Sequence, residues 1–287
     1  MILVTAATGH LGTATIEYLL KKNVPTSQIA GLVRDPKKAA GLSAKGIATW
    51  TGDYFDTASL ETAFQGIDTL VFISSGELQD RVAQHRNVVN AAKTAGVKHI
   101  IYTSVLKAAD TLKFFPAIDH YHTEAFLKES GIPYTVFRNT FYVEVLTMLL
   151  HSALESGQWY YAAGDAKANF AARTDMAEAI ANVAANPAPH ANKIYEITSN
   201  QSYTFNEIAG IVSKATGKAF NYIPVPLQAL KDGMKQAGVP EAHIPMYASI
   251  AEGISVGDLD AVDGSLEKLL QRKPVDLKEY LPKLLGA

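Results

Sequence analysis

The fold class of this 287-residue chain follows from its first residues, Ile2-Leu3-Val4-Thr5-Ala6-Ala7-Thr8-Gly9-His10-Leu11-Gly12. Its first four residues are apolar and mostly β-branched, and they predict a buried parallel strand. From Thr13 onward the sequence has the periodicity of a helix. A strand, a glycine-bearing turn and a helix N-terminus form the layout in which backbone N–H groups receive a pyrophosphate.

The two glycines of this turn have separate predicted roles. Gly9 lets a phosphate approach the backbone, and Gly12 lets the helix pack closely against the strand. Ala6 stands where a G-x-x-G-x-x-G pattern has its first glycine, so the turn requires either a negative φ or some strain there. A strand–turn–helix that binds nothing is the alternative. The predicted cofactor-binding residues of the turn are Thr8, Gly9, His10, Leu11 and Gly12.

Composition excludes several classes of protein. Hydrophobic residues make up 48% and charged residues 19% of the chain, as in ordinary globular proteins. The net charge of −2 gives no basic surface for nucleic acid or anionic lipid. The absence of cysteine removes disulfides, thiolate catalysis and cysteine metal sites, and no metal site is predicted. With no signal-peptide pattern and no apolar run of ~20 residues, we expect a cytoplasmic protein with no membrane or nucleic-acid partner.

Strand-like and helical stretches alternate along the chain and predict an α/β fold, a Rossmann-type doubly wound parallel sheet. Residues 1–150 are expected to form an NAD(P)-binding domain. Residues 151–287 are expected to form a smaller, irregular C-terminal α/β lobe that covers the substrate, with the strand near 193–198 returning to the main sheet. Within this lobe Thr204 and Glu207 have the spacing of a capping box, which predicts a helix over 204–216.

Arg34 favours NADPH as the cofactor. It ends the second predicted strand, 22 positions after Gly12. An acidic residue there would bind the ribose 2′-OH of NAD, whereas a guanidinium pairs with the 2′-phosphate of NADPH. The neighbouring Asp35 could turn inward and favour NADH, which stays as the alternative. An exposed arginine with no ligand is the other interpretation.

Further cofactor residues are expected at the carboxyl ends of the next strands. Asp53, beside Tyr54, follows the third predicted strand, where a carboxylate can accept from the adenine amino group; a turn-forming aspartate explains it equally well. The carboxyl ends of parallel strands form the ligand crevice of an open α/β sheet. The residues predicted to face the cofactor from the fourth and fifth strands are Ser74, Ser75, Thr103 and Ser104.

Several motifs together resemble the NmrA-like group of atypical short-chain dehydrogenase/reductases. The resemblance covers most of the chain and is nearest to the branch of type-2 NAD(P)H:quinone oxidoreductase and triphenylmethane dye reductase. The motifs are the turn at 4–12 quoted above, Leu32-Val33-Arg34, Gly52-Asp53-Tyr54, Gln84-His85-Arg86-Asn87-Val88, Ala95-Gly96-Val97-Lys98 and Arg138-Asn139.

The chain departs from the reductases of this superfamily that use serine with a Tyr-x-x-x-Lys pair. Ser104 can be aligned with the serine, but Tyr121 is followed four residues later by Ala125, and no lysine is present there. Reduction of a ketone creates a basic alkoxide that needs a positioned acid. Reduction of a quinone creates a delocalised phenolate that water can protonate. The prediction is therefore an NADPH-dependent reductase that passes hydride directly to a quinone or similar conjugated acceptor, without flavin. The alternatives are a non-catalytic NAD(P) sensor and a dye or imine reductase.

No catalytic residue is assigned from the sequence, but an acceptor slot is predicted. A small-molecule electron acceptor such as a quinone is the expected partner, and a homodimer is left open.

A neutral histidine near a bound quinone could donate a proton. His122, two residues after His120, faces another side of the helix, so the two do not form a metal pair. Packing between lobes explains the aromatic residues of the slot equally well. Glu124 is expected to be an exposed helix charge, and His85 a structural histidine or a neighbour of the ribose rather than a catalyst. The slot candidates are Asn139, Thr140, Phe141, Tyr142 and His120, with contributions from Phe114, Phe115 and His122.

Overall fold

The structure is a computed structural model that describes residues 1–77 and 80–286, without the side chains of residues 151 and 152. Contacts divide the chain into two compact units, each made of three segments. The first unit comprises Met1–Val105, Asp119–Arg138 and Thr174–Tyr195, and the second comprises Leu106–Ile118, Asn139–Arg173 and Glu196–Ala287. The single division near residue 150 stays a prediction.

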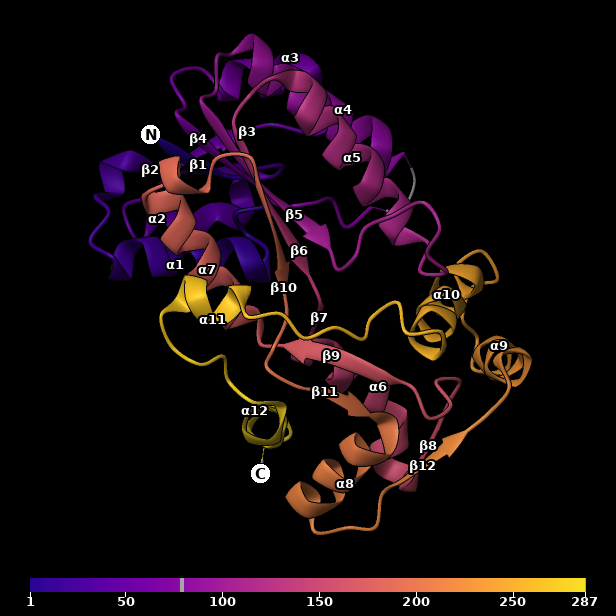
Figure 1. The fold of residues 1–287 in the computed structure, drawn as a ribbon. Coiled ribbons are helices and arrows are strands. Elements are labelled where there is room, and N and C mark those ends of the chain that lie inside the picture. The colour runs from indigo at the N-terminus through magenta and orange to yellow at the C-terminus, as the bar shows by residue number, and fades with distance from the viewer. Residues whose placement is uncertain (78–79, 287) are drawn as a thin grey trace. The chain divides into compact units, whose positions relative to one another are not determined.

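A seven-stranded parallel sheet, built mostly from the first unit, has the order β10-β6-β5-β4-β1-β2-β3 (Figure 1). The central strand β1 pairs with β2 on one side and β4 on the other, so the strand order reverses there. Ligands of open α/β sheets bind at the carboxyl ends of the strands beside such a reversal. The predicted Rossmann-type fold is confirmed. The strands are β1 (Ile2–Val4), β2 (Ile29–Val33), β3 (Ala48–Thr51), β4 (Thr69–Phe72), β5 (His99–Val105), β6 (Tyr134–Asn139) and β10 (Lys193–Ile197).

Helices cover both faces of this sheet, which explains why every residue of its central strands is buried. One face carries α1 (His10–Lys21), α2 (Ala40–Ser43) and α7 (Arg173–Ala185), and the other carries α3 (Thr57–Ala63), α4 (Arg81–Thr94) and α5 (Pro116–Ser130) (Figure 1). Three short 3-10 helices complete the first unit: η1 (Thr26–Gln28), η2 (Pro36–Ala39) and η3 (Ala188–His190).

The second unit contains two small sheets. One has the order β11-β9-β7, and the other pairs β8 with β12 in parallel. Trp159 of β8 packs its buried ring against Phe205 of α8 at 4.8 Å between centroids. The strands are β7 (Phe141–Tyr142), β8 (Gln158–Tyr161), β9 (Lys167–Ala171), β11 (Ser202–Thr204) and β12 (Asn221–Pro224). The helices are α6 (Val143–Ser156), α8 (Phe205–Thr216), α9 (Leu227–Gln236), α10 (Ile244–Ser255), α11 (Ser265–Leu270) and α12 (Leu277–Leu284).

The capping box of α8 is confirmed. The Thr204 hydroxyl accepts from the N–H of Glu207, and the Glu207 carboxylate accepts from the N–H of Thr204. The short strand β7 pairs with β9 before α6 begins at Val143.

The turn after β1 holds Ala6 in the left-handed region, at a φ of 46°. Its carbonyl accepts from the N–H of Gly9 at 2.9 Å, which closes the turn. A residue with a Cβ pays roughly 1–2 kcal/mol to adopt this conformation. Of the two options left by the sequence, the structure therefore has the strained one.

Replacing Ala6 with glycine should raise stability. The relief of strain exceeds the extra freedom that glycine gives the unfolded chain, so we expect a net gain of about 0.5–1 kcal/mol and a Tm higher by about 2 °C. Thermal unfolding without nucleotide measures this. Ala40→Gly is the matched control, since Ala40 has a φ of −52° and should lose stability on the same change. A Tm that falls equally in both variants would show that Ala6 is not strained.

Candidate functional site

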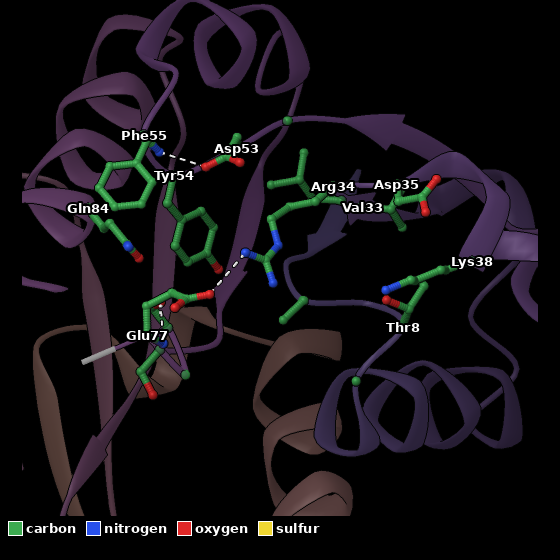
Figure 2. Close-up of a pocket in the computed structure, with 17 residues that line it drawn as sticks. Thr8, Val33, Arg34, Asp35, Lys38, Asp53, Tyr54, Phe55, Glu77 and Gln84 are labelled. Atoms are coloured by element: carbon green, nitrogen blue, oxygen red, sulfur yellow. Dashed lines mark hydrogen bonds and ion pairs between the residues drawn. The ribbon is translucent and has the colours of Figure 1, made fainter. Parts of the chain in front are cut away.

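The carboxyl ends of β1, β2, β3 and β4 surround a pocket of about 390 Å³ within the first unit (Figure 2). The predicted cofactor residues His10, Leu11, Gly12, Thr103 and Ser104 are not part of its wall, although the first three form the adjoining turn of α1. The predicted cofactor residues that the structure brings together in the wall are Thr8, Gly9, Arg34, Asp53, Tyr54, Ser74 and Ser75.

The N-terminus of α1 meets the pocket without a side-chain cap. Gly9 is the N-cap residue and lines the pocket, and the first N–H groups of the helix have no partner within it. A Cβ added at Gly12 would lie 2.4 Å from the carbonyl oxygen of Ala6 and 2.9 Å from the Cα of Ala7. The helix therefore packs on the turn only because residue 12 is glycine. An uncapped helix end beside a glycine turn fits a pyrophosphate.

Arg34 and Lys38 supply positive charge to the pocket wall, of which Thr8 is also part (Figure 2). The Arg34 side chain is 70% exposed and pairs through Nη1 with the Glu77 carboxylate at 3.3 Å. Exposed ion pairs of this kind are weak, so a phosphate can replace Glu77 as the partner. Asp35, in contrast, accepts from the N–H of Lys37 and caps η2. Its carboxylate is engaged in this cap, and the arrangement favours a phosphorylated ribose.

Asp53 and Tyr54 form a firmly held part of the wall. One carboxylate oxygen of Asp53 accepts from the N–H of Phe55 at 2.9 Å, as a turn-forming aspartate does. The Tyr54 hydroxyl donates to the carbonyl of Ile73 at 2.8 Å and also contacts the Thr5 hydroxyl. Burial raises the pKa of Tyr54 above its ordinary value, opposed by the Thr5 hydrogen bond and the Arg34 charge. The neutral phenol thus ties together the ends of β1, β3 and β4.

Behind the pocket a buried hydrogen-bond network holds Ser75 in place. The Nε2 atom of His85 accepts from the N–H of Ser75 at 3.0 Å, and its Nδ1 atom lies 2.8 Å from the Thr123 hydroxyl. Desolvation, with a contribution from the nearby positive charge of Arg81, lowers the pKa of His85 to about 3. The ring is therefore neutral at pH 7, and His85 has the structural role expected of it.

The slot candidate His120 belongs to the same buried network. Its side chain is 7% exposed and its Nδ1 atom lies 2.6 Å from the Tyr102 hydroxyl. Burial lowers the pKa of His120 well below its usual range, and the positive charge of Arg81 makes a smaller contribution in the same direction. His120 is neutral and lies outside the pocket wall. His122, on the other side of α5, is exposed.

Ser104 donates its hydroxyl proton to a carboxylate. Its Oγ atom lies 2.6 Å from Oε1 of Glu124, and Arg138 binds the same carboxylate through Nε and Nη2 at 3.0 and 2.7 Å. The Glu124 side chain is only 10% exposed, so the expectation of an exposed helix charge is wrong. A buried carboxylate needs such partners. With its proton engaged, the Ser104 hydroxyl is not free to polarise a substrate carbonyl.

The other slot candidates lie in the second unit or border it. The Thr140 hydroxyl donates to the Asn169 carbonyl, and Phe141 meets Phe114 edge-on at 5.3 Å. The Arg173 guanidinium lies over the Tyr142 ring at 4.7 Å. The Asn139 amide is buried, and neither its oxygen nor its nitrogen has a hydrogen-bond partner in the described part of the chain. A shared slot made by these residues stays a prediction.

Within residues 1–77 and 80–286 no helix is both long and apolar enough to cross a membrane. The same residues contain no group of three or more histidines and carboxylates placed to hold a metal ion.

Comparison with known proteins assigns the family. A model of the NmrA-like family matches residues 1–281. Quinone oxidoreductase 2 of Escherichia coli is 41% identical over 286 residues, which are 100% of this chain and 99% of that protein. The crystal structure of the E. coli NADPH-dependent quinone oxidoreductase complexed with NADPH matches with a TM-score of 0.95 over 99% of this chain and 100% of that one.

Two dye-reducing proteins are also similar. The structure of Citrobacter sp. triphenylmethane reductase complexed with NADP(H) matches with a TM-score of 0.93 and 38% identity, covering 99% of each chain. An NAD(P)H azoreductase of Xenophilus azovorans is 30% identical over 266 residues, 91% of each protein. The match along nearly the whole chain places this protein in the NmrA-like family.

Proposed function

We propose that the protein is an NADPH-dependent oxidoreductase that passes hydride directly to a quinone or a similar conjugated acceptor, without a flavin. The observation that carries the proposal is the pocket at the reversal of strand order, where an uncapped helix N-terminus and Arg34 present two separate anion sites. The similarity to E. coli quinone oxidoreductase 2 supports the same reaction.

The residues of the pocket fit this cofactor. The turn from Thr8 to Gly12 would hold the pyrophosphate with backbone N–H groups, and Arg34 would pair with the 2′-phosphate. NADPH supplies a hydride, which together with one proton from water converts a quinone to a hydroquinone. The chain has no need to furnish a strong acid for this reaction, in agreement with the engaged hydroxyl of Ser104.

The experiment is a direct assay of the purified protein. Titration with NADPH and NADH should show tighter binding of NADPH. Benzoquinone and naphthoquinones should then support oxidation of NADPH, followed by the loss of nicotinamide absorbance, while the protein's visible spectrum shows no flavin bands. Binding of NADPH without turnover on any acceptor would instead establish the non-catalytic sensor.

Dye reduction is the second candidate, because an azoreductase and a triphenylmethane reductase are among the similar proteins. Addition of hydride to a cationic dye neutralises its charge and again requires no acid. An azo dye and a triphenylmethane dye in the same assay compare kcat/KM for the acceptor classes. The cytoplasmic location and the homodimer remain predictions from the sequence.

Replacing Tyr121 with phenylalanine should leave quinone reduction within about twofold of the original rate, because no acid role is assigned to this hydroxyl. Tyr121 is 41% exposed on α5, so loss of one oxygen should not disturb the fold. Steady-state kinetics with a naphthoquinone measures the effect on kcat and on KM. A collapse of kcat in a variant with unchanged Tm would show that the hydroxyl takes part in the reaction.

A further inference from the structure

A buried amide in the pocket wall lacks a hydrogen-bond partner. Gln84 lies in the first turn of α4 and is 2% exposed, and its Nε2 atom makes no hydrogen bond within the described residues. The same side chain lines the pocket. Burial of an unpartnered amide is costly, and nearly all buried polar atoms in folded proteins have a partner. A buried donor at the wall of a cavity therefore indicates that a bound ligand supplies the acceptor.

The position of Gln84 in the pocket indicates which part of a bound ligand its side chain can contact. Figure 2 shows Gln84 beside Phe55 and Tyr54, on the opposite side of the pocket from Thr8 and Lys38. The side of the pocket at Thr8 and Lys38 has the positive charge of Lys38 and the glycine turn after β1, and both fit phosphates. At the Gln84 side the ring of Phe55 is 57% exposed, which is unusual for a phenylalanine and suits a flat, uncharged ligand group.

We propose that Gln84 recognises the adenine base of the bound dinucleotide, with its Nε2 atom donating a hydrogen bond to a ring nitrogen. Adenine offers ring nitrogens as acceptors and an amino group as donor, and a glutamine amide is complementary to both. The inference rests on the proposed dinucleotide function. It gives Gln84 a role distinct from that of Arg34: Arg34 reads the 2′-phosphate, whereas Gln84 reads the base.

The test separates the two halves of the cofactor. Gln84→Met keeps the length of the side chain and removes its polar atoms. Calorimetry with 2′,5′-ADP, the adenosine half, should show binding about tenfold weaker than that of the unaltered protein. The rate with reduced nicotinamide mononucleotide as hydride donor should not change, and neither should the ratio of NADPH to NADH affinity.

Stability without nucleotide distinguishes recognition from a structural role. Because the Nε2 atom has no protein partner, the Tm of Gln84→Met should equal or exceed that of the unaltered protein. Gln65→Met is the matched control, since Gln65 is exposed and donates to the Glu61 carbonyl outside the pocket. This control should bind 2′,5′-ADP normally. If Gln84→Met does not fold, Gln84→Leu serves instead, because it is also uncharged and lacks the donor.

The outcomes separate the two proposals. Unchanged 2′,5′-ADP affinity in a folded Gln84 variant would overturn the adenine contact and leave the dinucleotide function intact. A lower Tm without nucleotide would show that the amide supports the fold, and would also overturn it. If the unaltered protein binds neither 2′,5′-ADP nor NADPH, the proposed function itself fails.

Discussion

Replacing Gly12 with alanine should greatly weaken nucleotide binding and destabilise the first unit. The new Cβ would lie 2.4 Å from the Ala6 carbonyl oxygen and 2.9 Å from the Ala7 Cα. Both atoms belong to the backbone, so no rotamer change relieves the clash and the N-terminus of α1 must move away from the turn. Overpacking of this kind costs about 3 kcal/mol, and the displaced N–H groups no longer point at the phosphate site. We expect affinity for NADPH to fall by at least about 100-fold.

The matched control for this substitution is Gly41→Ala. Gly41 lies in α2, and a Cβ added there meets nothing within 4 Å. Alanine also favours the helix by about 1 kcal/mol, so this variant should be at least as stable as the original and bind NADPH normally. Calorimetric titration and thermal unfolding of both variants provide the measurement. Normal NADPH affinity in Gly12→Ala would mean that the turn is not the phosphate site.

Replacing Arg34 with alanine should weaken the binding of NADPH far more than the binding of NADH. Hydrogen bonds to charged groups contribute about 1.5–3 kcal/mol, so we expect NADPH affinity to fall about 10- to 150-fold and NADH affinity by less than about threefold. The exposed ion pair with Glu77 is lost at the same time, but such pairs contribute little. Titration of both nucleotides at one ionic strength measures the difference, because salt screens the phosphate contact.

Two further variants test whether the lower NADPH affinity of Arg34→Ala comes from loss of the contact with the 2′-phosphate. Arg86→Ala removes another arginine of the same unit, whose guanidinium packs 4.4 Å from the centre of the Phe126 ring, and should leave the preference for NADPH unchanged. Glu77→Gln removes the carboxylate that competes with the phosphate for Arg34, and should raise NADPH affinity about twofold. Equal losses for both nucleotides in Arg34→Ala would refute recognition of the 2′-phosphate.

Local sequence patterns were sufficient to predict most of the helices and strands of the first unit. The apolar run of β1, the glycines after it and the following helix signal lie within about 20 consecutive residues, and each acts on its near neighbours. The same holds for the capping box of Thr204 and Glu207, which are three residues apart. By contrast, β12 pairs with β8 about sixty residues earlier, Tyr222 beside Trp159, and short strands of this kind carry no local signal of their partner.

Two site residues show what sequence patterns could not reveal. Glu124 was expected to be an exposed helix charge, but Ser104 and Arg138 bind it from two adjacent strands. Gln84 belonged to a family motif and had no assigned role until its burial and its unpartnered amide became visible. Both depend on residues that are close in space and distant along the chain.

The Rossmann-type fold, the glycine turn and the arginine after β2 can all be predicted from the amino-acid sequence, since they rest on hydrophobic periodicity and on the backbone freedom of glycine, both local properties. The strain at Ala6, the cap that Asp35 gives η2, the engaged proton of Ser104 and the place of Gln84 in the pocket wall became known from the folded chain alone. A hydrogen bond or a clash exists only between atoms already brought within a few ångströms by the whole fold.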